Sequence, residues 1–104
     1  MIITGGFNVY PAEIERVLLL DDSVHEAAVV AAPDERMGEV GVAFLVPRPG
    51  RSIDVDALLA QARTMLAAYK VPRAVRVVSE LPKNASMKVL KHQLRDQLRA
   101  ESER

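Results

Sequence analysis

The apolar residues that follow Pro11 recur with the period of a helix. Ile14, Val17 and Leu18 stand at positions i, i+3 and i+4, which predicts a helix with one buried stripe. Pro11 suits the first turn of this helix, because the N–H that proline lacks has no intrahelical partner there. The acidic pair at 21–22 marks the end of the helix.

Several apolar runs bounded by turn-forming residues predict strands. The run at 24–32 is rich in alanine and valine and lies between Asp22 and Pro33, which favours a buried strand over a helix. The Pro-Arg-Pro-Gly sequence at 47–50 ends the strand before it. The predicted extended segments are 1–4, 24–32, 42–46 and 75–78, and the predicted loops are 5–8, 33–41 and 79–87.

Two further amphipathic patterns predict helices. Asp54 is a good N-cap for the first of them, and Ile53 and Leu58 are spaced to pack across that cap. The buried faces are predicted to comprise Val55, Leu58, Leu59, Ala62 and Leu66 in this helix and Val89, Leu90, Leu94 and Leu98 in the last one.

The element order is therefore extended–α–β–β–α–β–α, which predicts an α+β fold. We expect a single domain over residues 1–104, with a small, mostly three-stranded sheet and helices covering one of its faces. The tail at 99–104 is expected to fray.

Composition narrows the function. Lys plus Arg number 14 and Asp plus Glu number 14, so the net charge of zero argues against a general nucleic-acid binder. No cysteine is present, which excludes disulfides and thiolate chemistry. The N-terminal residues lack the pattern of a signal peptide, and no apolar run approaches the roughly 20 residues of a transmembrane segment. We expect a cytoplasmic location.

Two segments carry candidate chemistry. Residues 5–15 read GGFNVYPAEIE, a glycine pair followed by a Tyr-Pro helix start and an acidic first turn. Residues 81–91 read LPKNASMKVLK, a loop with lysines that leads into the last helix. Taken singly, a glycine pair is usually a turn and a loop lysine is usually a solvated charge.

Together these segments resemble the C-terminal domain of acyl-CoA synthetases and related adenylate-forming enzymes. That family opens the domain with a similar glycine, Tyr-Pro and Glu-Ile-Glu signature. Near its end it carries a Pro-x-x-x-Ser/Thr-Gly-Lys segment, and the lysine of that segment matches Lys88. The resemblance runs from Met1 to about Leu98 and is strongest to fatty-acid or acyl-CoA ligases.

The resemblance implies a two-step reaction and a role for each segment. A carboxylate attacks the α-phosphate of ATP to give an acyl-adenylate, and the thiol of CoA then displaces AMP. Lys88 would be the catalytic residue of adenylation, because its ammonium offsets the repulsion between the two anions. Gly5, Gly6 and Phe7 would lie beside the pantetheine tunnel in the second step.

The resemblance also implies partners that lie outside this sequence. ATP with its Mg²⁺, the acyl carboxylate and CoA would bind mainly to a larger N-terminal adenylation domain. The present chain is then a lid that is inactive alone, with no metal site of its own. We expect a fragment: an excised domain, a proteolytic remnant or a separately encoded lid.

Two other enzyme types and a non-enzyme remain open from the sequence. The chain is also compatible with the matching subdomain of a peptide-synthetase adenylation domain or of a luciferase-like enzyme. A stand-alone binding module is the third possibility, and its one hint is Met87, which stands where the family pattern has glycine. Met87 would cost roughly 1–2 kcal/mol if its backbone needs a positive φ.

The remaining polar residues have simpler explanations. His25 and His92 lack acidic neighbours at metal-ligand spacing, so we expect a strand end and a helix surface. The acidic group of Asp34, Glu35 and Glu39 predicts a solvated loop rather than a cation site.

Overall fold

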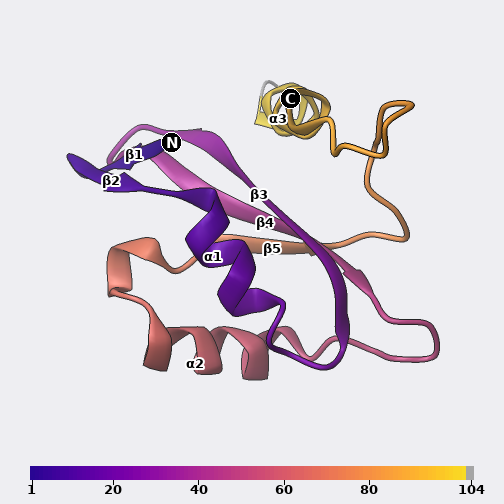
Figure 1. The fold of residues 1–104 in the computed structure, drawn as a ribbon. Coiled ribbons are helices and arrows are strands. Elements are labelled where there is room, and N and C mark those ends of the chain that lie inside the picture. The colour runs from indigo at the N-terminus through magenta and orange to yellow at the C-terminus, as the bar shows by residue number, and fades with distance from the viewer. Residues whose placement is uncertain (103–104) are drawn as a thin grey trace.

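The computed structural model describes residues 1–102 as an α+β domain, which confirms the predicted fold class (Figure 1). In chain order its elements are β1 (Ile2–Thr4), β2 (Phe7–Val9), α1 (Pro11–Leu18), β3 (Val24–Asp34), β4 (Gly38–Pro47), α2 (Val55–Met65), the 3-10 turn η1 (Ala68–Lys70), β5 (Ala74–Val77) and α3 (Lys91–Ser102).

The sheet has five strands, so the prediction of a mostly three-stranded sheet was wrong. Its order is β2-β1-β4-β3, all antiparallel, and β5 pairs with β4 in parallel. β1 confirms the extended segment predicted at 1–4, and the unpredicted strand β2 pairs with it in a hairpin in which Ile2 pairs with Val9 and Thr4 with Phe7. β2 has three residues, which is too short for a period-2 pattern to show in the sequence. The predicted loop at 5–8 therefore shrinks to a turn at 5–6.

Helices cover both faces of the sheet rather than one. Figure 1 shows α1 and α2 on one side and α3 on the other. The central strand β4 explains this arrangement. Successive side chains along a strand point to opposite faces of the sheet, and in β4 the side chains on both faces are apolar. Ala43 and Leu45 belong to the core under α1 and α2, and Val42, Phe44 and Val46 belong to the core under α3.

The predicted loop at 33–41 is mostly strand. β3 and β4 pair out to Pro33–Glu39 and Asp34–Gly38, which leaves only a short turn between them. Pro33 is tolerated because β3 is an edge strand and its missing N–H interrupts no ladder on the outer side. The extension of β3 and β4 into this segment was not predicted because many of its side chains are polar. Backbone hydrogen bonds between strands form whether or not the side chains are hydrophobic.

The helix predictions hold with small shifts at the ends. Asp54 caps α2, its Oδ1 accepting the Ala57 N–H at 3.1 Å. Leu94 and Leu98 are buried on α3, but this helix begins at Lys91 rather than at Val89. Residues 99–102, expected to fray, are helical, while 103–104 lie outside the described residues. Within residues 1–102, none of the helices has the length and apolar character needed to cross a bilayer.

Phe44 tests the two-sided core. It is fully buried on the α3 side of β4. We expect Phe44→Ala to lower the free energy of unfolding by about 3–5 kcal/mol, because it leaves a cavity under α3. Val77→Ala, at a half-exposed site on β5, should change it by less than about 0.5 kcal/mol. Urea unfolding of both variants measures the difference, and equal losses would contradict the assignment of Phe44 to a core.

Candidate functional site

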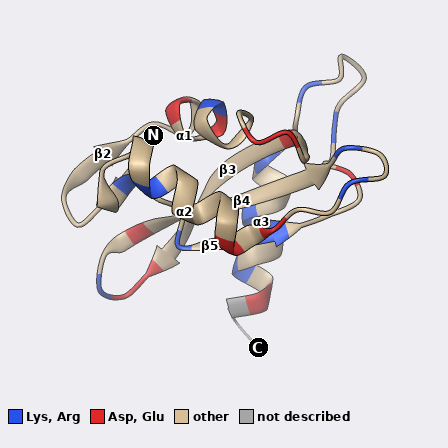
Figure 2. Ribbon diagram, turned by 90° about the horizontal axis from the view of Figure 1, so that it is seen from below, with Lys and Arg blue, Asp and Glu red and all other residues tan. Residues whose placement is uncertain are grey.

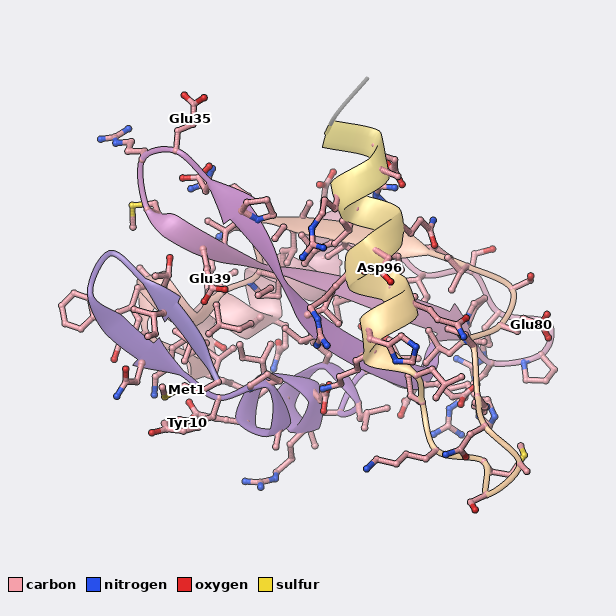
Figure 3. The ribbon with its side chains drawn as sticks, turned by 90° about the horizontal axis from the view of Figure 1, so that it is seen from above. Met1, Tyr10, Glu35, Glu39, Glu80 and Asp96 are labelled. Atoms are coloured by element: carbon pink, nitrogen blue, oxygen red, sulfur yellow. The ribbon has the colours of Figure 1, made fainter. Side chains whose placement is uncertain are left out.

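The two candidate segments fold into two hairpins. The glycine hairpin comprises residues 2–9, which form β1, β2 and their turn. The lysine hairpin comprises residues 82–90, which are closed by a bridge between Lys83 and Val89. They lie at opposite ends of the domain, on the left and the right of Figure 1, and the view from above agrees (Figure 3). The domain measures 38 × 34 × 27 Å along its principal axes.

The turn of the glycine hairpin depends on its two glycines. Gly5 and Gly6 have φ values of 56° and 85°, the positive pair that a two-residue hairpin turn requires. The Gly5 N–H donates to the Met37 carbonyl at 2.8 Å, and a Cβ on Gly5 would approach Met37 Cε to 2.8 Å. A Cβ on Gly6 would meet nothing within 4 Å. Gly6 therefore exposes bare backbone at the tip.

An aromatic stack supports this hairpin. The ring of Phe7 lies 4.6 Å from that of Tyr69 on η1, with an angle of 22° between their planes. The neighbouring Lys70 forms an ion pair with Glu13 on α1 at 2.9 Å. The hydrogen bond to Glu13 raises the pKa of Lys70 above its ordinary value, so Lys70 stays charged. Phe7 is nonetheless 55% exposed, so more than half of its side chain remains open to solvent.

Asn84 organises the tip of the lysine hairpin. Its Oδ1 accepts the N–H groups of Ser86 at 2.9 Å and Lys88 at 3.0 Å. Its carbonyl accepts the Met87 N–H at 2.9 Å, and its own N–H donates to the Lys88 carbonyl. This is a three-residue hairpin loop of the kind that ends on a left-handed residue. Asn84 is not among the residues that the sequence pattern singled out, although asparagine is favoured at the first position of such turns.

Met87 occupies the left-handed position of that turn. Its φ is 65°, and within residues 1–102 it is the sole residue other than glycine with a positive φ. The backbone at this position therefore favours glycine, and methionine carries a strain of about 1–2 kcal/mol. The hydrogen bonds from the N–H groups of Ser86 and Lys88 to Asn84 hold the turn in this conformation despite the strain. The side chain of Met87 is 70% exposed, so it fits without a clash.

Lys88 differs from the other lysines in its surroundings. Lys70, Lys83 and Lys91 each form an ion pair, with Glu13, Glu26 and Glu15 respectively. In the part of the chain that the structure describes, the ammonium of Lys88 has no acidic partner, and its side chain is exposed. A cation that is held on an ordered turn and left uncompensated is available to an anionic ligand.

An open groove of about 660 Å³ lies beside Lys88. Its wall carries the basic side chains of Lys88, Lys91, His92 and Arg95 and a single carboxylate, Glu15. The local charge is positive although the whole chain is neutral, and Figure 2 shows basic and acidic residues interspersed over the remaining elements. The groove is therefore suited to an anion.

The other candidate residues have structural explanations. Glu39 accepts the Ile3 N–H at 2.9 Å, and Asp34 accepts the Met37 N–H at 2.8 Å. Glu39 thus links β4 to β1, Asp34 closes the β3–β4 turn, and Glu35 projects outward at the tip of that turn (Figure 3). His25 and His92 are exposed on β3 and α3. The described residues contain no group of three His, Cys, Asp or Glu that could hold a metal ion.

Comparison with known proteins identifies the class that this fold and these hairpins define. The AMP-binding enzyme C-terminal domain family matches residues 13–88, and the chain belongs to that family.

Among its relatives, a 3-[(3aS,4S,7aS)-7a-methyl-1,5-dioxo-octahydro-1H-inden-4-yl]propanoyl:CoA ligase of Mycobacterium tuberculosis is 55% identical over 96 residues, which are 92% of this chain and 19% of that protein. A feruloyl-CoA synthase of Amycolatopsis is 50% identical over 95 residues, which are 91% of this chain and 19% of that protein.

Solved structures show the same fold. The acyl-CoA synthetase of Brucella canis superposes with a TM-score of 0.91 at 32% identity, covering 97% of this chain and 19% of that one. A fatty acyl CoA synthetase of Mycobacterium tuberculosis superposes with a TM-score of 0.88 at 40% identity, covering 97% of this chain and 20% of that one. The chain thus spans about a fifth of the length of the relatives that it matches.

The strain at Met87 gives a direct test of the lysine hairpin. We expect Met87→Gly to raise the free energy of unfolding by about 1 kcal/mol, because glycine adopts a positive φ without a Cβ clash. Gly50→Ala is the matched reverse change, since Gly50 has a φ of 76° and a Cβ there meets nothing within 4 Å. It should lower stability by a similar amount in urea unfolding. A loss of stability in Met87→Gly would contradict the assigned backbone conformation.

Proposed function

We propose that this chain is the mobile C-terminal domain of an ATP-dependent acyl-CoA ligase. The observation that supports this most directly is the placement of its two hairpins at opposite ends of one domain. A single orientation of the domain cannot present both hairpins to one active site. A reaction with two steps can use both, if the domain rotates between the steps.

In the proposed first step the lysine hairpin faces the active site. A substrate carboxylate attacks the α-phosphate of ATP, forming the acyl-adenylate and releasing pyrophosphate. The ammonium of Lys88 lies between the two anions and stabilises the negative charge that develops on the phosphate oxygens. Lys88 suits this role because it projects from an ordered turn and no carboxylate neutralises it within the described residues.

In the proposed second step the domain turns and the glycine hairpin faces the active site. The thiol of CoA attacks the carbonyl carbon of the acyl-adenylate, the thioester forms and AMP leaves. Gly5 packs its backbone against Met37 to form the turn, the bare backbone at Gly6 leaves room for the narrow pantetheine arm, and the exposed ring of Phe7 provides an apolar wall beside it. Withdrawal of Lys88 removes the charge that the first step required.

The substrates are proposed to bind mainly to a larger N-terminal adenylation domain. The described residues offer no cluster of acids for Mg²⁺, so Mg²⁺ would arrive with ATP. The acyl group would be selected by that domain as well. The chemistry requires ATP and CoA together, and we therefore propose a cytoplasmic location.

Lys88→Met tests the first step in the full-length enzyme that carries this domain. We expect acyl-adenylate formation to fall roughly 10²–10³-fold, because one charge-stabilising donor is lost. Thioester formation from chemically prepared acyl-adenylate and CoA should be unchanged. Pyrophosphate release and thioester absorbance measure the two steps separately. Unchanged adenylation in Lys88→Met would refute the role of Lys88 and the ligase proposal with it.

Gly6→Val tests the second step. The added side chain extends from the tip of the glycine hairpin into open space, where the pantetheine arm is proposed to pass. We expect thioester formation to fall roughly 10–100-fold and adenylation to stay within about twofold of the parent. Gly50→Val, at another glycine with a positive φ and open surroundings, controls for backbone strain. An equal effect of both variants on thioester formation would contradict the placement of the glycine hairpin.

A further inference from the structure

The arms of the lysine hairpin are fastened by ion pairs on both sides of its tip. Lys83, before the turn, binds Glu26 of β3 at 2.5 Å. Lys91, after the turn, binds Glu15 of α1 at 2.7 Å. The four side chains are only 20–34% exposed, so solvent screens these pairs less than it screens pairs on an open surface.

The tip between these pairs has little else to hold it. Residues 84–88 are all exposed, and apolar packing is confined to the base, where Leu81 is buried and Val89 contacts the core under α3. Backbone bonds join the two arms at the Lys83–Val89 bridge and between the Leu90 N–H and the Pro82 carbonyl at 2.8 Å, and the bonds of Asn84 shape the turn itself without attaching it to the rest of the domain. An isolated hairpin of this size is marginal in water. The orientation of the tip therefore depends on how its arms are attached.

Glu15 is itself held in place. Its Oε2 accepts the Val29 N–H of β3 at 2.8 Å as well as the Lys91 ammonium. Val29 lies on the edge strand, so Glu15 also satisfies a backbone donor that would otherwise be unpaired. A carboxylate fixed by a backbone bond loses little further freedom when it binds a lysine. Glu15, Lys91 and Lys88 line the same groove, which places this anchor beside the proposed reacting group.

We infer that Glu15 and Glu26 are positioning residues for the adenylation step, which they serve by clamping Lys91 and Lys83 and so fixing Lys88. This inference rests on the proposed function. The glutamates do not touch substrate in this scheme. They act through the two flanking lysines, and these hold the turn that carries Lys88 at a fixed angle to the sheet.

The test uses Lys83→Met, Lys91→Met and the double variant in the full-length enzyme. Methionine keeps the length of the side chain and removes the ion pair. We expect adenylation to fall roughly tenfold in each single variant and roughly 100-fold in the double variant, because small misplacements of a catalytic group are costly. Thioester formation from prepared acyl-adenylate should stay within about twofold of the parent. Lys91→Arg, which keeps the charge, should restore most of the adenylation rate.

Arg76→Met is the matched control. Arg76 binds Glu101 at 2.6 Å and ties the far end of α3 to β5, with exposures of 40% and 35%. This variant removes a comparable ion pair from the same helix without freeing the lysine hairpin, so both half-reactions should be unchanged.

The possible outcomes distinguish a failure of the clamp, meaning the two ion pairs that Glu15 and Glu26 form with Lys91 and Lys83, from a failure of the proposed function. Adenylation that stays near the parent rate in the double variant would overturn the clamp. Equal losses in both half-reactions would also overturn it, because they indicate a general structural role. If Lys88→Met itself keeps full adenylation activity, the proposed function fails first. Loss of adenylation in Lys88→Met but not in the clamp variants refutes the clamp alone.

Discussion

The domain depends on a central strand that is apolar on both faces. β4 contributes Ala43 and Leu45 to one core and Phe44 to the other, so helices must cover both sides. It is also the strand on which β1, β3 and β5 assemble. The glycine hairpin joins β4 at one end, where Thr4 pairs with Gly38. The lysine hairpin leaves the sheet beyond β5 at the other.

This arrangement separates the two proposed active surfaces while keeping them in one body. α1 follows directly from the glycine hairpin, and its Glu15 binds Lys91 at the start of α3. A rotation of the domain would therefore move both hairpins together, without bending the chain between them. The two hairpins must be held rigidly in the domain, because each of them has to reach the active site in a defined geometry.

Each hairpin tip uses a positive φ, but in different ways. The glycine turn adopts two such residues at no Cβ cost and leaves its backbone bare. The lysine turn places Met87 in the same region of backbone space and carries the resulting strain. The hydrogen bonds to Asn84 explain why the strained turn is still well defined. A residue that departs from the family pattern is thus accommodated in a turn whose backbone is held by the bond from the Lys88 N–H to Asn84.

The sequence by itself determined the fold class, the helices and the main strands, because hydrophobic periodicity and capping are local properties. It also singled out Lys88 and the glycine pair through resemblance to a known family. Only the tertiary structure decided that helices cover both faces of the sheet, that the glycine hairpin extends the sheet, and that Met87 has a positive φ. The tertiary structure alone paired Lys91 with Glu15 and, among residues 1–102, gave Lys88 no acidic partner. Such pairings join residues far apart in the chain, and local patterns do not encode the distance between them.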